Sequence, residues 1–142
     1  MSFVLDASMA LAWQFPRADA AEAALAIKIL TELPASGASV PAIWHSEVAN
    51  ALLRGERAGK IPTLQVSYFL EQLAKSTIAP DAEPQWSSLP RAVALARVHG
   101  LTAYDASYLE LAQRLTLPLA TFDRKLAEAA RATGVRVFGA GV

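Results

Sequence analysis

Short apolar segments alternate with helical segments along this chain, and this alternation is the feature that most restricts its fold. Short apolar runs, the signature of buried strands, occupy residues 3–6, 38–40, 77–79, 117–121 and 135–138. Composition and spacing predict helices over residues 19–33, 43–58, 63–75, 104–114 and 124–133. Strands that alternate with helices form βαβ units, so we predict an α/β fold with a parallel sheet covered on both faces.

The stretch from Pro80 to Pro90 is expected to be a loop or a helix-entry region, because it contains three prolines in eleven residues. It is not a domain linker, since a helical pattern resumes at once in RAVALARVHG. With 142 residues and no internal repeat, residues 1–142 are predicted to form a single domain.

Charge and cysteine content exclude several classes of protein. Thirteen Lys and Arg balance thirteen Asp and Glu, which argues against a protein that coats nucleic acid but not against an enzyme that acts on it. The chain has no cysteine, and this excludes disulfides, thiolate zinc sites and a cysteine nucleophile. The N-terminus lacks a basic region before its first apolar run, and no segment approaches the roughly 20 apolar residues of a membrane span. We therefore expect a soluble, cytoplasmic protein.

Two aspartates directly follow predicted strands. Asp6 ends the first strand in FVLDAS, and Asp123 follows the fourth in LPLATFD. In open parallel sheets the ligand site lies beyond the carboxyl ends of the strands, where both would project. Each also precedes a helix, so N-capping alone explains either one equally well.

Two further carboxylates lie on predicted helices. Glu47, in PAIWHSEVANALLRG, lies at the edge of the buried face of its helix, and Asp105, in LTAYDASYLELA, lies at the start of another. Taken singly, a solvated glutamate and an aspartate that complements the helix dipole are the better explanations. Together with Asp6 and Asp123 they suggest a cluster, in which each pair at about 4 Å would repel by roughly 4 kcal/mol. A divalent cation is the simplest counter-charge, and all-oxygen ligation favours Mg²⁺ or Mn²⁺ and metal-assisted attack of water on a phosphodiester.

Four segments resemble, in order, the acidic motifs of PIN-domain nucleases, specifically the VapC-type toxins of toxin–antitoxin pairs: VLDAS, SEVANAL, LTAYDASYLELA and LATFDRKL. The resemblance covers nearly the whole chain. It implies a three-layer α/β/α domain whose five-stranded parallel sheet has the order 3-2-1-4-5. It also implies an Mg²⁺-dependent endoribonuclease that forms a homodimer and is inhibited by a VapB-type antitoxin.

The resemblance also assigns roles to residues. Asp6, Glu47, Asp105 and Asp123 would form the catalytic metal site, with Thr121 in the catalytic set. Ser8 and Thr121 match hydroxyl positions that support the metal or its waters. Arg124 and Lys125 are expected to bind substrate because they stand beside Asp123, and Ser8 is the third expected substrate-binding residue.

Several surface assignments stay open at the level of sequence. Arg54, Arg57 and Lys60 either meet RNA phosphates or complement a helix C-terminus. Five aromatic residues either line a groove for the antitoxin or belong to the core: Trp13, Phe15, Trp44, Tyr68 and Phe69. For Trp44 the core is the favoured interpretation.

Other families fit less well. Haloacid-dehalogenase phosphatases need a second aspartate where this chain has Ser8, and receiver domains need an adjacent acidic pair after the first strand. A non-catalytic PIN-like module that binds metal or RNA remains the alternative.

Overall fold

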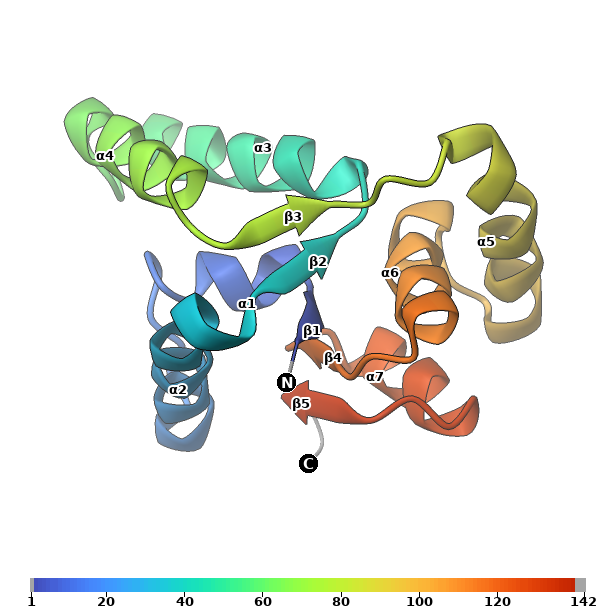
Figure 1. Cartoon of the computed structure of the whole chain (residues 1–142). Coiled ribbons are helices and arrows are strands. Elements are labelled where there is room, and N and C mark those ends of the chain that lie inside the picture. The colour runs from blue at the N-terminus through green and yellow to red at the C-terminus, as the bar shows by residue number, and fades with distance from the viewer. Residues whose placement is uncertain (1, 140–142) are drawn as a thin grey trace.

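The computed structural model describes residues 2–139, which form a five-stranded, all-parallel sheet with helices around it (Figure 1). The strand order is β3-β2-β1-β4-β5, which confirms the expected 3-2-1-4-5 order. The strands are β1 (Phe3–Leu5), β2 (Ala38–Val40), β3 (Ile78–Pro80), β4 (Leu119–Thr121) and β5 (Val137–Gly139). The helices are α1 (Ala7–Leu11), α2 (Ala20–Ser36), α3 (Ile43–Arg57), α4 (Thr63–Ala74), α5 (Gln85–His99), α6 (Ala103–Leu115) and α7 (Arg124–Ala132).

The chain changes direction across the sheet between β1 and β4. From β1 it proceeds through β2 to β3, and helices α1–α4 cover one face; it then crosses to β4 and β5, and helices α5–α7 cover the other (Figure 1). Right-handed crossovers place successive helices on opposite faces when the direction reverses. A crevice forms at such a switch point beyond the carboxyl ends of the strands, where ligands bind in open α/β sheets. Asp6 and Asp123 follow the two strands that flank it.

The central strands are buried because helices cover them on both sides. Every residue of β1 and β4 is buried, including the polar Thr121, and Leu5 pairs with Ala120 in register. This register places Asp6 beside Thr121, one position further along, and the Asp6 N–H donates to the Ala120 carbonyl over 3.0 Å.

The structure corrects three details of the expected elements. Helix α2 continues through Pro34 to Ser36. The segment expected to be a loop or a helix-entry region contains the start of α5 at Gln85, and Pro90 lies inside this helix. A proline has no N–H to donate to the carbonyl four residues earlier, which here belongs to Leu30 or Trp86, and both of these residues are exposed. The short α1, with five residues, was not predicted because it is too short to show a helical period.

No helix within the described part of the chain is long and apolar enough to cross a bilayer.

Candidate metal site at the switch point

Asp6 lies at the end of β1, and its side chain is held by two hydroxyl groups. Ser8 Oγ donates to Asp6 Oδ2 over 2.6 Å, and Thr121 Oγ1 donates to the same oxygen over 2.7 Å. Asp6 is only 6% exposed and no cation pairs with it within residues 2–139. Although it occupies the N-cap position of α1, its side chain makes no capping hydrogen bond. Capping therefore does not explain why an aspartate stands here.

Asp123 is held at the other side of the switch point. Its backbone N–H donates to Thr121 Oγ1 over 3.0 Å, and its Oδ1 accepts from the Leu126 N–H over 2.9 Å, so it caps α7. Ser8 Oγ also accepts from the Phe122 N–H over 2.9 Å. Ser8 and Thr121 therefore tie the loop after β1 to the loop after β4.

Glu47 and Asp105 reach the same region from helices α3 and α6. Glu47 Oε1 accepts a hydrogen bond of 2.6 Å from the hydroxyl of Tyr108, whose side chain is fully buried. Asp105 lies in the first turn of α6, where its N–H is capped by Thr102 Oγ1 over 3.1 Å. Tyr108 follows Asp105 by three residues, so both point from the same side of α6.

The four carboxylates interact electrostatically. Burial raises the pKa of Asp6 above its ordinary value, and the charges of Asp105 and Asp123 raise it further, against the hydrogen bonds from Ser8 and Thr121. The pKa of Asp105 is raised by burial and by Asp123, and Lys125 opposes this shift. The pKa of Glu47 is raised by burial and by Asp6 and Asp105, while Tyr108 opposes it. The site therefore disfavours its own negative charge and gains stability from a cation.

The donor atoms suit a hard divalent cation. Within the described residues, three of the four carboxylates keep one oxygen that accepts no hydrogen bond: Asp6 Oδ1, Glu47 Oε2 and Asp123 Oδ2. The fourth, Asp105, interacts with the side chain of Thr102. Oxygen ligands of this kind match Mg²⁺ and Mn²⁺. As the side chains are placed, however, no three Asp, Glu, His or Cys residues between positions 2 and 139 are arranged closely enough to hold an ion. The carboxylate oxygens are therefore suitable ligands for such a metal, but the side chains would have to move closer together to bind it.

Of the two basic residues expected to bind substrate, Lys125 lies beside the acidic site. Arg124 and Lys125 begin α7, directly after Asp123. The positive charge of Lys125 opposes the rise in the pKa of Asp105. Its Nζ lies near the turn between α5 and α6, where a Cβ added at Gly100 would be 3.8 Å away. The charge of Lys125 therefore lies near the acidic site, and Arg124 adjoins Asp123 in the chain.

The aromatic residues do not gather into one groove. Trp44 and Phe69 are buried in the core, while Tyr68 is 57% exposed on α4. Trp13 packs against the core and donates from Nε1 to the Ala26 carbonyl over 2.9 Å. Phe15 lies against α3 at Gly55.

Sequence reasoning missed Tyr108, whose apolar ring and helical spacing resemble those of a core residue. Its burial, the nearby carboxylates and its hydrogen bond to Glu47 raise the pKa of Tyr108 far above its usual range, so its hydroxyl stays protonated and acts as a donor. A fully apolar position would be filled more simply by Phe, so a tyrosine at this place in α6 is the signal available in the sequence.

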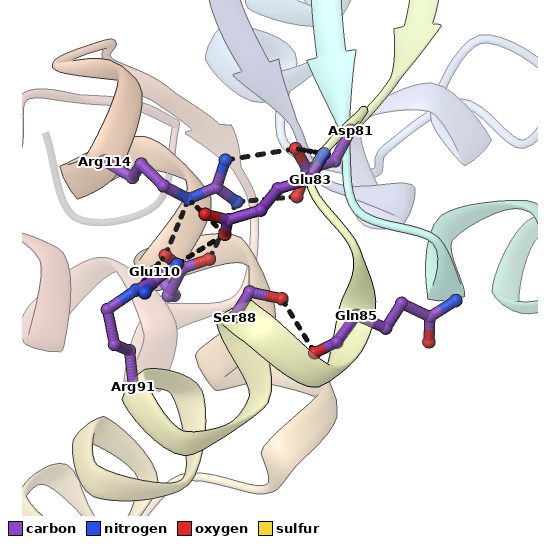
Figure 2. Close-up of polar contacts among 7 residues, drawn as sticks. All are labelled: Asp81, Glu83, Gln85, Ser88, Arg91, Glu110 and Arg114. Carbon is purple, nitrogen blue, oxygen red and sulfur yellow. Dashed lines mark hydrogen bonds and ion pairs between the residues drawn. The ribbon is translucent and has the colours of Figure 1, made fainter.

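An ion-pair network that the sequence did not indicate holds α6 in place (Figure 2). Arg114 on α6 contacts Asp81 Oδ2, just after β3, over 2.6 Å and Glu110 Oε2 over 2.9 Å. Arg91 on α5 contacts the same oxygen of Glu110 over 3.1 Å and also pairs with Glu83. Because α6 carries Asp105 and Tyr108, this network fixes the helix that supplies one side of the acidic site.

Comparison with known proteins identifies the family. Residues 3–132 match the model of the PIN domain. The chain is 34% identical over 128 residues to Ribonuclease VapC3 of Pyrobaculum aerophilum, a match that covers 90% of this chain and 94% of the relative.

Solved structures share the fold. PAE2754 from Pyrobaculum aerophilum superposes with a TM-score of 0.72 at 25% identity, covering 97% of this chain and 90% of its own. FitAcB from Neisseria gonorrhoeae has a TM-score of 0.64 at 22% identity and covers 98% and 97% of the two chains, and at that identity it supports the fold alone. A toxin–antitoxin complex from Klebsiella pneumoniae has a TM-score of 0.61 at 20% identity, and the match covers 88% of this chain and 89% of the other. It likewise supports the fold alone. The sheet order, the full-length relative and the family match lead to one assignment: the chain belongs to the PIN-domain family and is of the VapC type.

Proposed function

We propose that this protein is a metal-dependent endoribonuclease that acts as the toxin of a type II toxin–antitoxin system. The observation that carries the proposal is the buried Asp6, which among residues 2–139 has hydroxyl partners but no cationic one, and which lies at the switch point with Asp105 and Asp123. Membership of the VapC type supports it, because the relative of 34% identity is named a ribonuclease.

Asp6, Glu47, Asp105 and Asp123 would hold Mg²⁺, or Mn²⁺ in its place, through carboxylate oxygens, and Glu47 and Asp123 each have one oxygen that accepts no hydrogen bond within the described residues. A bound ion of this kind lowers the pKa of a coordinated water and stabilises the leaving oxygen of a phosphodiester.

The protein's own residues would orient this site and its substrate. Ser8 and Thr121 fix Oδ2 of Asp6 by donating to it, which leaves Oδ1 turned to a ligand. Tyr108 does the same for Glu47 through Oε1. Lys125, beside Asp105, would bind a phosphate oxygen of the RNA, and Arg124 would reach the neighbouring backbone.

The proposed partners are those of a toxin. We expect a VapB-type antitoxin to inhibit the protein, two copies to form a homodimer and the pair to act in the cytoplasm, where the RNA substrate is. The fold shared with a protein solved as a toxin–antitoxin complex supports an antitoxin partner.

The test uses protein purified without any antitoxin and a pool of cellular RNA. Cleavage is expected with Mg²⁺ or Mn²⁺ and is expected to stop on addition of EDTA. Asp6→Asn is expected to reduce the rate by about 100-fold or more, because it removes a charge that faces the reacting centre. Glu71→Gln, on the exposed face of α4, serves as a matched control and should cleave like the unmodified protein.

Two outcomes would contradict the proposal. Cleavage that persists in EDTA would remove the metal mechanism. Binding of Mn²⁺ without cleavage of any RNA would favour the non-catalytic PIN-like module instead.

A further inference from the structure

Three exposed cations border a groove at the C-terminal end of α3. The groove, here called the α3 groove, has a volume of about 670 Å³. Its lining residues are Phe15, Ala51, Arg54, Gly55, Arg57, Ala58 and Lys60. Within residues 2–139 neither arginine nor the lysine forms an ion pair. The groove therefore offers unpaired positive charge around an apolar floor.

Two elements connect the α3 groove to the acidic site. Helix α1 packs against α3, and Asp6 precedes α1 while Phe15 follows it. Near the C-terminal end of α3, the phenyl ring of Phe15 packs on Gly55: a Cβ added to this glycine would lie only 2.8 Å from Cζ of the ring. The charge of Asp6, just before α1, also raises the pKa of Glu47 on α3. Helices α1 and α3 therefore run side by side in the same direction, from the acids to the groove.

One face of α3 leads from the metal site into the groove. Glu47, Ala51, Arg54 and Ala58 follow one another at helical spacings of four, three and four residues, so they form a single stripe beside the buried one. Glu47 and Arg54 are seven residues apart, which is about 10 Å along the helix axis. A strand of a few nucleotides spans this distance.

The helix dipole accounts for only part of this arrangement. Arg54 and Arg57 lie in the last turn of α3, where cations are favourable. The dipole does not account for Lys60, which lies beyond the helix, or for the apolar floor that the cations surround. A nucleic acid strand that extends from the acidic site would account for both the cations and the floor, because its phosphates are negatively charged and its bases have apolar faces.

We propose that the α3 groove binds the phosphates of single-stranded RNA next to the bond that is cleaved, with a base over the floor formed by Phe15 and Gly55. The inference rests on the proposed ribonuclease function and specifies the path of its substrate. The strand would run along α3 from Glu47 to Arg54, so that phosphates beyond the scissile one meet the three cations.

The test measures the affinity of a short fluorescein-labelled oligouridylate in EDTA over a series of KCl concentrations. The variant carries three glutamines in the groove: Arg54→Gln, Arg57→Gln and Lys60→Gln. Its affinity is expected to fall roughly 10-fold or more at low salt, and the slope of log K against log salt is expected to fall by about 0.7 for each lost contact. In cleavage assays with Mg²⁺, KM should rise while kcat changes little, since the acidic site is intact.

The matched control removes the same charge from exposed positions in α2, in α5 and directly after α4. Its changes are Lys28→Gln, Lys75→Gln and Arg97→Gln. This control should keep the slope of the unmodified protein, and the melting temperatures of both variants verify that they fold.

The outcomes separate this inference from the proposed function. If the unmodified protein cleaves RNA but the groove variant binds with an unchanged slope, the inference is overturned, and an acidic protein segment becomes the better occupant of the groove. An equal loss in the groove variant and the control would also overturn it, because net charge alone would then explain the effect. Failure of the unmodified protein to cleave, with the slope change present, would instead contradict the proposed function.

Discussion

At the scale of single residues, hydroxyl groups determine how the carboxylates of the site point. Ser8 and Thr121 both bond one oxygen of Asp6, and Tyr108 bonds one oxygen of Glu47. Each carboxylate is thereby held by one oxygen and leaves the other for a ligand. Partners that orient a metal ligand in this way typically change metal affinity by about 10- to 100-fold when removed.

Tyr108→Phe tests this role because it removes one oxygen and leaves the packed ring. We expect about 10-fold weaker binding of Mn²⁺, measured by calorimetry, together with a loss of stability of about 1 kcal/mol for the buried hydrogen bond. Tyr68→Phe, at an exposed tyrosine, is the matched control and should change neither quantity.

If Tyr108 acts through Glu47, its removal should add nothing to the effect of Glu47→Gln on Mn²⁺ affinity in a double-mutant cycle. Additive losses would show that the hydroxyl does not act by positioning Glu47.

At the scale of elements, the network around Glu110 anchors helix α6 to α5 and to the segment that follows β3 (Figure 2). The Glu110 side chain is only 5% exposed, and both Arg91 and Arg114 bond it. Burial opposes the ionisation of Asp81, but Arg114 and the Glu83 backbone together lower the pKa of Asp81 below its ordinary value. Removing Glu110 takes away the buried acceptor that both arginines share, although Arg91 keeps Glu83 and Arg114 keeps Asp81.

Glu110→Ala is therefore expected to lower the free energy of unfolding by about 1.5–3 kcal/mol, measured in urea, as expected for lost hydrogen bonds between charged groups. The comparison is Glu71→Ala, which breaks the exposed pair with Lys75 and should cost about 0.5 kcal/mol or less. Equal effects of the two changes would mean that the network around Glu110 does not stabilise α6.

At the scale of the whole molecule, the balanced charge conceals an uneven distribution. If a metal neutralises the four acids of the site, thirteen bases face nine acids over the rest of the chain. That excess suits a polyanionic substrate, and the three cations of the α3 groove belong to it.

The acidic site should also make stability depend on pH when no metal is present. Burial and the neighbouring acids raise the pKa of Asp6 above its unfolded value of 3.8. Below that pH Asp6 is protonated in both states; as the pH rises through the raised folded value, the folded protein loses a proton that the unfolded protein has already released. Asp6 therefore lowers the free energy of unfolding at neutral pH and contributes nothing at low pH.

In EDTA, Asp6→Asn is expected to melt a few degrees above the unmodified protein at pH 7 and at the same temperature near pH 3.5. Addition of Mg²⁺ at pH 7 should raise the melting temperature of the unmodified protein and have little effect on the variant. A variant that melts lower than the unmodified protein in EDTA at pH 7 would contradict the repulsion inferred for this site.

The sequence by itself determined the alternation of strands and helices, the parallel sheet and the two acids that follow β1 and β4. Such features are local: the period of apolar residues and the position of a polar residue after a strand can be read within a short window. The resemblance of the motifs to a known family added the prediction of Glu47 and Asp105 as site residues and of the order of the strands.

Only the tertiary structure decided which groups meet. The hydrogen bond from Tyr108 to Glu47 spans 61 residues, and the one from Thr121 to Asp6 spans 115. The ion pairs of Glu110 and the groove between Phe15 and Gly55 likewise depend on how elements pack. No local pattern encodes such contacts, because a tyrosine or an arginine has the same helical spacing whether it faces a carboxylate, the core or water.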